Sequence, residues 1–239
     1  MARLFFLTVM LFALAGSTFW YLAHDSTLKK GAMETLAKFS KIKKIQPLAD
    51  AGNAEAQYKL AAIYETGDGA SKNQKKAFDW YLKSAEKGFG ASQYKVGSMY
   101  ASGVGVRQNF FMAAKWYRLA ATFNKNTLAE FRLGELYFNG RGVEHDYGKA
   151  IEFYTKAARK GHAASQYLLG SMYEDGWGVP LDYIKAYVWL KRAIVHKAEA
   201  LAVHKRYDPE KKIKILMKKM NRFQIEEAEK RLLKLGFKR

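Results

Sequence analysis

The chain has 239 residues, of which 49% are hydrophobic, 26% are charged and none is cysteine. This composition is typical of a globular protein, and it excludes a disordered chain, a collagen-like chain and a membrane protein with many spans. The absence of cysteine excludes disulfides, thiolate metal sites and a cysteine nucleophile. With 41 Lys and Arg against 22 Asp and Glu, the formal net charge of +19 favours anionic partners or surfaces.

Residues 1–23 are predicted to be a targeting segment. The run from Leu4 to Ala23 carries no charge, and its 20 residues would span ~30 Å as a helix, about one bilayer core. A signal peptide cut after Ala15 fits equally well, because residues 13–15 have the small-x-small form of a cleavage site. The signal-peptide interpretation favours a periplasmic or secreted protein of the cell envelope. The alternative is an inner-membrane anchor that faces the cytoplasm, which the lysines after the run favour.

The middle of the chain is organised by an internal repeat. Four columns of residues recur at steps of 36, 37 and 36, which no chance pattern produces in one register. The columns are Gly67, Gly103, Gly140 and Gly176; Tyr64, Tyr100, Tyr137 and Tyr173; Ala77, Ala113, Ala150 and Ala186; and Trp80, Trp116, Phe153 and Trp189. We place the repeats at about 52–87, 88–123, 124–160 and 161–197, together residues 50–197.

Each repeat is predicted to be a pair of helices. Ala56, Leu60 and Tyr64 form one apolar stripe of a first helix, and a G-x-G loop follows, with its first glycine where a left-handed cap is expected. A small residue after the Leu60 position, which is Ala61, Gly97, Gly134 or Gly170, lets a neighbouring helix approach closely. The second helix carries the Trp80 column, which we expect in the core, and ends at Gly88, Asn124 and Gly161 in the first three repeats. Glycine and asparagine tolerate the left-handed conformation, so we expect these three residues to adopt it as caps.

The two ends of the repeat array are expected to be caps. Residues 24–49 read as a basic linker and an N-terminal half-repeat, because residues 48–52 repeat the ending of a second helix one period upstream. In the fourth repeat Lys197 stands where a glycine would end the second helix, so we expect that helix to continue past His196. Residues 198–239 read as basic capping helices, with a helix start at Asp208-Pro209 and a capping box of Asn221 with Gln224.

The repeats resemble the Sel1-like repeat family. The matching stretches are AQYKLAAIYETGDG…KKAFDWYLKSAEKG, SQYKVGSMYASGVGV…MAAKWYRLAA, AEFRLGELYFNGRGV…GKAIEFYTKAARKG and SQYLLGSMYEDGWGV…IKAYVWLKRA. Tetratricopeptide repeats have a period of 34 and lack the G-x-G loop. The resemblance implies an all-α, right-handed α-solenoid of stacked αα-hairpins, with a concave face that binds proteins. The N-terminal hydrophobic helix precedes it.

The sequence holds no catalytic constellation. No two histidines lie four residues apart, and there is no H-E-x-x-H, G-x-S-x-G or P-loop. We therefore expect no enzyme activity, no cofactor and no metal site. A cell-wall-related hydrolase is the weaker alternative, since the chain lacks the cysteines of relatives linked with that activity and shows no Ser-x-x-Lys with partners.

A partner-binding groove is predicted on the concave side, which the first helices line. Its aromatic members lie on the face of the first helix away from the second helix, and basic residues follow them in three repeats. The set is Tyr58, Tyr94, Phe131, Tyr167, Lys59, Lys95 and Arg132. Aromatic and basic side chains together suit an extended acidic or mixed peptide. Packing between repeats is the other interpretation of this row, and single-stranded nucleic acid is disfavoured by the export signal.

The predicted function is a non-enzymatic scaffold or adaptor of the bacterial cell envelope that binds protein partners in this groove. The alternative is contact with an anionic membrane or cell wall through the basic C-terminal helices, where 16 Lys and Arg stand against 6 Asp and Glu from Lys191 onward. The lysines assigned to that surface are Lys211, Lys212, Lys214, Lys218 and Lys219. The membrane is also a partner if the N-terminal segment stays uncleaved.

Overall fold

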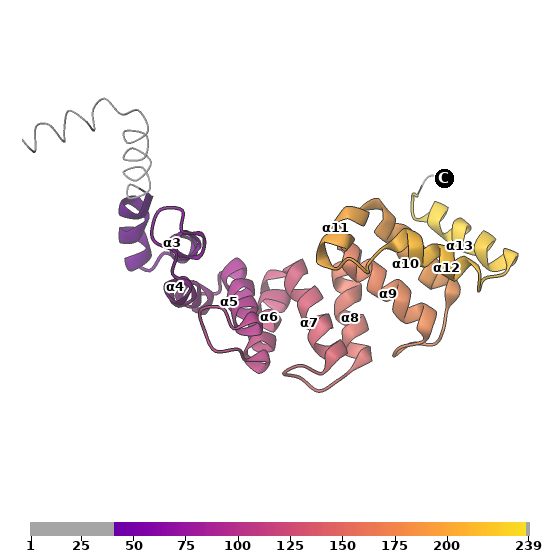
Figure 1. The fold of residues 1–239 in the computed structure, drawn as a ribbon, viewed down its shortest axis with the longest axis horizontal. Helices are drawn as coiled ribbons and strands as arrows, with labels where there is room; N and C mark the ends of the chain where they lie inside the picture. Colours follow the sequence, from indigo (N-terminus) through magenta and orange to yellow (C-terminus); the bar gives the residue numbers. More distant parts are fainter. Residues whose placement is uncertain (1–40, 238–239) are drawn as a thin grey trace, which may run out of the picture. The chain divides into compact units, whose positions relative to one another are not determined.

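The structure is a computed structural model that describes residues 41–237, and all regular secondary structure in that range is helical (Figure 1). The chain divides into two units, one up to Lys83 and one from Ser84 onward. The predicted targeting segment, residues 1–23, and the linker up to residue 40 lie outside the described residues. Each unit is described by itself.

The described part of the first unit contains a helix over residues 41–50, helix α3 (Ala54–Thr66) and most of helix α4 (Gln74–Glu86). Ala49, Ala56 and Leu60 form its buried core, against which Ile42 and Trp80 pack in part. A buried glutamine ties α3 to the preceding helix, since Gln57 Nε2 donates to the carbonyl of Ala49 at 3.0 Å.

The second unit contains three helix hairpins followed by three further helices. The hairpins are α5 (Gly90–Ser102) with α6 (Phe110–Asn124), α7 (Thr127–Asn139) with α8 (Tyr147–Arg159), and α9 (Ala163–Asp175) with α10 (Tyr183–Val195). They stack in chain order, because α6 packs on α7 and α8 packs on α9 (Figure 1). The chain continues through α11 (Lys197–Val203), α12 (Pro209–Met217) and α13 (Arg222–Lys234). This is the predicted solenoid of αα-hairpins.

The G-x-G loops act as predicted at the helix ends. Gly140 ends α7 in the left-handed conformation, with φ of 62°, and its N–H donates to the carbonyl of Leu136. The second glycine of this loop permits close stacking, because a Cβ on Gly142 would lie 2.2 Å from the carbonyl carbon of Phe110 in the preceding repeat. One expectation is wrong. Lys125 rather than Asn124 takes the left-handed conformation after α6, with φ of 49°, and Asn124 is the last helical residue.

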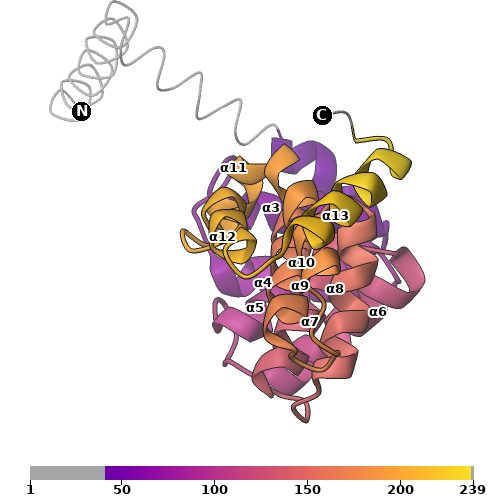
Figure 2. The same ribbon diagram turned by 90° about the vertical axis from the view of Figure 1, so that its right-hand side faces the viewer.

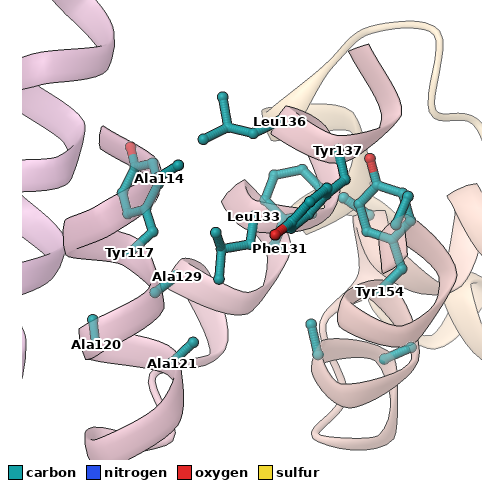
Figure 3. Packing of buried hydrophobic residues seen from close by; sticks show 14 of the residues in the cluster. Ala114, Tyr117, Ala120, Ala121, Ala129, Phe131, Leu133, Leu136, Tyr137 and Tyr154 are labelled. Atoms are coloured by element: carbon teal, nitrogen blue, oxygen red, sulfur yellow. The ribbon is translucent and has the colours of Figure 1, made fainter. Parts of the chain in front are cut away.

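Small residues on the first helices let a large ring of the second helix lie against them. A Cβ on Gly97 would meet the Tyr117 ring at 2.6 Å, and one on Gly134 would meet the Tyr154 ring at 2.5 Å. Both tyrosines are 2% exposed or less, and they pack with Phe131, Leu133 and their neighbours in one core (Figure 3). The close approach predicted from the glycines is therefore confirmed in this unit.

The Trp80 column is less deeply buried than predicted. Trp116 is 9% exposed, while Trp80, Phe153 and Trp189 are only half-buried. Cations cover two of these rings in the second unit, since Lys156 lies 5.0 Å from the Phe153 centroid and Arg192 lies 4.7 Å from that of Trp189. The fully buried position is the next residue along the chain, Tyr117 and its equivalents, because that ring lies over the glycine of the first helix.

The C-terminal helices cap the fourth repeat. Ile213, Leu216 and Leu232 join Tyr187 and Leu190 in one buried cluster, so α12 and α13 cover α10 (Figure 2). Both predicted helix starts are present, with Asp208 capping α12 ahead of Pro209 and a complete capping box of Asn221 with Gln224 at α13. The prediction that the second helix of repeat four continues past His196 is wrong. Helix α10 ends at Val195, and His196 has φ of −120° and ψ of 40°, outside the helical region.

Candidate partner-binding face

The first helices α5, α7 and α9 form one surface of the second unit, here called the A-helix face. The position of its aromatic row around the first helix predicts side chains that point away from the second helices. The structure shows that they do not. The Tyr94 and Tyr117 ring centroids lie 5.8 Å apart, and those of Phe131 and Tyr154 lie 6.0 Å apart. The reason is the intervening glycine, which lets the ring of the second helix reach across the first. In the first unit, Tyr58 lies 5.4 Å from Tyr81 in the same way.

Phe131 is a core residue, so the prediction that it contacts a partner is wrong. It is 1% exposed, because it packs on Tyr154 (Figure 3) and the centroid of the His162 ring lies 4.5 Å from its own. Tyr94 and Tyr167 are half-buried and retain exposed surface. The row of partly exposed aromatic side chains is therefore interrupted at Phe131, in the third repeat.

The three basic members of the predicted groove differ in their surroundings. Lys59 is exposed in the first unit and pairs with Glu55 at 2.6 Å, whereas Lys95 is half-buried on α5. Arg132 is half-buried, lies 5.3 Å from the Phe131 centroid, and binds Glu135 at 2.7 Å. Burial alone lowers the pKa of the Arg132 guanidinium, but the Glu135 carboxylate outweighs burial, so the net pKa is raised. Arg132 therefore stays charged on the A-helix face.

A cavity of about 310 Å³ opens on this face between α5 and α7. Phe110, Tyr117 and Leu136 provide apolar walls. Its polar lining comes from both first helices and from the loop after α7, and consists of Ser98, Ser102, Arg132, Glu135, Asn139 and Arg141. Pockets that bind ligands begin at about this volume and combine apolar walls with a few polar groups.

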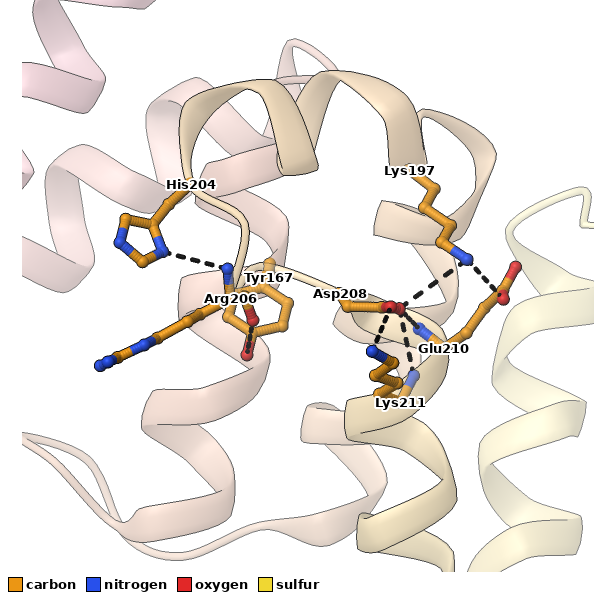
Figure 4. A network of polar contacts seen from close by, with 7 residues as sticks. All are labelled: Tyr167, Lys197, His204, Arg206, Asp208, Glu210 and Lys211. Atoms are coloured by element: carbon orange, nitrogen blue, oxygen red, sulfur yellow. Dashed lines mark hydrogen bonds and ion pairs between the residues drawn. The ribbon is translucent and has the colours of Figure 1, made fainter.

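Farther along the A-helix face, the chain covers Tyr167 with its own C-terminal segment. The Tyr167 hydroxyl donates to the carbonyl of Arg206 at 3.0 Å (Figure 4), and its ring stacks on Tyr207 with centroids 5.0 Å apart. Helix α11, which leads into this segment, packs on α9. Tyr207 also packs against the core that contains Phe131 and Tyr154. Tyr167 is thus engaged within the chain.

Two of the five lysines assigned to the basic surface pair with the same buried carboxylate. Lys212 and Lys219 each lie 2.7 Å from a carboxylate oxygen of Glu174, whose side chain is 1% exposed. Burial raises the pKa of Glu174, but hydrogen bonds and charge from the two lysines outweigh it and lower the pKa overall. The remaining three, Lys211, Lys214 and Lys218, are exposed, and Lys211 lies 3.9 Å from a carboxylate oxygen of Asp208.

His162 begins α9 and also covers the core. Its Nδ1 accepts from the backbone N–H of Ser165 at 3.2 Å, which caps the helix. Burial first, and then the positive charge of Arg132, lower the pKa of His162 to about 4. This ring is therefore neutral at physiological pH and has a structural role.

Sequence reasoning missed one polar column that joins the repeats. Gln93 donates to the carbonyl of Ala85, and Gln166 donates to the carbonyl of Ala158 at 3.0 Å, each linking a first helix to the preceding second helix. In the third repeat Glu130 takes this place and binds Lys160 at 2.7 Å. The signal was present, because Gln57, Gln93, Glu130 and Gln166 recur at the repeat period.

Metal-ligating side chains do not cluster in residues 41–237, where no group of three His, Asp or Glu could hold an ion. None of the helices formed by these residues has the length and apolar character needed to cross a membrane.

Family comparisons agree with this geometry. The family model for the Sel1 repeat matches residues 54–89, 90–122, 127–162 and 163–194, more than half of the chain. The chain belongs to the Sel1 repeat family. A Sel1 repeat protein from Oxalobacter formigenes has a similar solved structure, with 31% sequence identity and a TM-score of 0.61 over 71% of this chain and 72% of that one.

A second similar structure is c5321, a protective antigen with an SLR fold from uropathogenic Escherichia coli. It shows 29% identity and a TM-score of 0.63, over 72% of this chain and 40% of that longer one. Comparison with curated proteins gives no match. Sel1 repeat proteins generally mediate protein–protein interaction, and their scaffold fold is typically non-enzymatic.

Proposed function

We propose that this Sel1 repeat protein is a non-enzymatic scaffold of the bacterial cell envelope, and that it binds a protein partner on the A-helix face between α5 and α7. The observation that carries this proposal is the cavity there, which Tyr117, Arg132 and Arg141 line. Tyrosine and arginine are the residue types enriched in the energetically dominant parts of protein interfaces. The groove predicted from the sequence is thereby reduced to its part around Tyr94 and Arg132, since Phe131 is buried and Tyr167 is covered.

The envelope location rests on the uncharged N-terminal run and on the family. The Escherichia coli relative is a protective antigen, a description with which an envelope location is consistent. The absence of cysteine allows a direct test. A single cysteine in place of the exposed Lys230 is labelled in intact cells with a membrane-impermeant maleimide after the outer membrane alone is opened. We expect labelling, whereas protection until the inner membrane is lysed would place the repeats in the cytoplasm.

The partner-binding face is tested by site-specific photo-cross-linking in living cells. A photoreactive amino acid at Ser102 or Asn139, beside the cavity, is compared with one at Glu152, which is exposed on α8. We expect discrete cross-linked protein bands from the first two positions and none of the same size from Glu152. Identical bands from all three positions, or none from any, would contradict binding at this face.

A second candidate function, contact with anionic lipid, is favoured by a recess of about 360 Å³ between α10 and α13. Val188, Trp189 and Leu235 form its apolar lining, and four basic side chains surround it: Lys185, Arg192, Arg231 and Lys234. Within the described residues, the buried Nε of Arg192 has no hydrogen-bond partner. Apolar walls with a cationic rim suit a lipid that carries an anionic headgroup.

The probe for this recess is dihexanoyl phosphatidylglycerol below its micelle concentration, because it avoids any contribution from an N-terminal anchor. We expect it to bind more tightly than dihexanoyl phosphatidylcholine, and we expect Arg231→Gln with Lys234→Gln to remove the difference. The matched control replaces Lys214 and Lys218 on α12 and should leave binding unchanged. Equal binding of the two lipids would rule this function out.

A further inference from the structure

The cavity between α5 and α7 has an equivalent place one repeat farther along, and there it is filled. Ala101, Phe110 and Arg141 of the cavity correspond, at the repeat period, to Phe138, Tyr147 and Trp177. The last three form an aromatic trio. The Phe138 centroid lies 5.3 Å from that of Tyr147 and 5.6 Å from that of Trp177. Side chains of the chain itself therefore occupy the space that is open between α5 and α7.

An aromatic side chain from a distant segment also packs on α9, at Tyr167, whose repeat equivalent Tyr94 lies 5.8 Å from the cavity residue Tyr117. Tyr207 stacks on Tyr167 and packs against the core that includes Tyr154, the equivalent of Tyr117 in the cavity wall. Its own segment offers a backbone carbonyl to the Tyr167 hydroxyl (Figure 4). The A-helix face thus accepts, at Tyr167, an aromatic ring from a loop, with a backbone carbonyl bound beside it.

The cavity between α5 and α7 has the features that such a ring requires. Phe110 and Tyr117 offer aromatic surface, and aromatic pairs gain free energy beyond the area that they bury. Arg132, Glu135 and Asn139 can bind a phenol hydroxyl, which a leucine or phenylalanine side chain lacks. Two arginines against one glutamate give the lining a net positive charge, which favours acidic residues beside the inserted ring.

We propose that the cavity between α5 and α7 accepts a tyrosine side chain from an acidic segment of the protein partner. Ala101 creates this site by being small where its equivalent, Phe138, is large. The inference rests on the proposed function, because it specifies the partner chemistry for the same face.

The test uses the full chain and a small probe, N-acetyl-3-fluoro-L-tyrosine amide, followed by fluorine NMR line broadening. A ligand of this size binds with a dissociation constant of about millimolar order. Unlabelled N-acetyl-L-tyrosine amide should displace the probe at least about five times better than N-acetyl-L-leucine amide. Equal displacement by the two amides would overturn the inference.

Ala101→Phe is the decisive variant, because it places between α5 and α7 the phenylalanine that stands at the equivalent position, Phe138, between α7 and α9. We expect it to weaken probe binding at least about tenfold while the helical circular dichroism stays unchanged. Arg141→Trp, which copies Trp177, is a second variant with the same expected result and protects the test against misfolding of the first. The matched control is Ala198→Phe on the exposed side of α11, which should bind the probe as the wild type does.

The two proposals fail in distinguishable ways. If Ala101→Phe folds and binds the probe like the wild type, the tyrosine site is wrong. If partner cross-links from Asn139 also persist in that variant, the proposed scaffold function stands without the tyrosine site. Absence of cross-links in the wild type would instead contradict the proposed function itself.

Discussion

The interface between α5 and α7 and the interface between α7 and α9 are built from the same repeat. They differ in whether the chain's own side chains fill the space between the helices. At the first, Ala101 leaves a cavity of about 310 Å³. At the second, Phe138 packs with Tyr147 and Trp177 in the equivalent space, and Tyr207 stacks on Tyr167 of α9. The columns that stack the repeats are the same in both. The difference teaches that smaller side chains at equivalent positions can leave a cavity between two repeats of such an array, without any change in the scaffold.

The largest effect expected from this comparison concerns the two buried tyrosines. Tyr154→Ala removes a ring that is 1% exposed in the filled interface, and we expect it to cost ~3–5 kcal/mol in the free energy of unfolding. Tyr117→Ala should cost less, because the Tyr117 ring already borders the open cavity. Urea denaturation followed by circular dichroism measures both. An equal or larger loss for Tyr117→Ala would mean that the two interfaces are equally well packed.

The next effect concerns the ion pairs that hold the C-terminal segment in place. Glu174→Ala leaves Lys212 and Lys219 without their carboxylate, and Glu174 is 1% exposed. Breaking a buried pair from one side costs 3–5 kcal/mol, and the partial exposure of the lysines reduces this to about 2–3 kcal/mol. The control is Glu226→Ala, which removes the exposed pair with Arg222 and should have no measurable effect. Comparable losses for the two variants would show that the Glu174 pair contributes no more than a surface contact.

A smaller effect is expected from pH, because His162 covers Phe131 in the filled interface. The pKa of His162 is about 4 in the folded chain against an ordinary 6.5. As pH falls through 6.5 the unfolded chain takes up a proton that the folded chain refuses, so the free energy of unfolding falls. Allowing for partial exposure, the loss is about 1 kcal/mol between about pH 7.5 and about pH 5.

His162→Asn provides the matched variant for this pH effect. Asn126 caps α7 at the equivalent position, so the variant keeps a cap acceptor. We expect the variant to lose about 1 kcal/mol less than the wild type over the same pH interval. Urea midpoints at the two pH values measure this difference, and parallel losses would assign the pH dependence to another group.

The smallest effect concerns stability in the variant that fills the cavity. Ala101→Phe should raise the free energy of unfolding by about 1 kcal/mol or less, because the new ring occupies space that is already open. A ring forced into a packed core would instead cost about 1–3 kcal/mol. Thermal unfolding of the variant beside Ala198→Phe distinguishes these outcomes.

The parts of this fold that could be predicted from the sequence are those that depend on local geometry repeated four times. Gly140 ends a helix because glycine adopts positive φ without strain, and Gly134 marks a close approach because it has no Cβ. The capping box at Asn221 is equally local, since donor and acceptor lie three residues apart. Each of these signals is complete within one segment of chain.

The candidate site depended on contacts that no single segment contains. The angle around the helix placed Phe131 on the outer face, but the ring of Tyr154 and the cover of His162 bury it. Tyr207 stacks on Tyr167 of α9, which lies 40 residues earlier in the chain. The small size of Ala101 is informative only in comparison with Phe138 at the equivalent position. The repeat positions and the two helices of each repeat could be predicted from the sequence pattern. The direction of a side chain at an interface is decided by its tertiary neighbours.

The stacking of hairpins has a consequence for how the chain acquires its structure. Even the polar contacts that fasten the C-terminal cap span only 45 residues, from Glu174 to Lys219, and 42 residues, from Tyr187 to Glu229. Arrays with such short sequence separations fold rapidly and can nucleate in any hairpin. As the chain emerges N-terminus first, each hairpin can form once about 40 residues are available. Structure would thus advance along the polypeptide at the pace of its synthesis or transport, and the terminal helices would close it last.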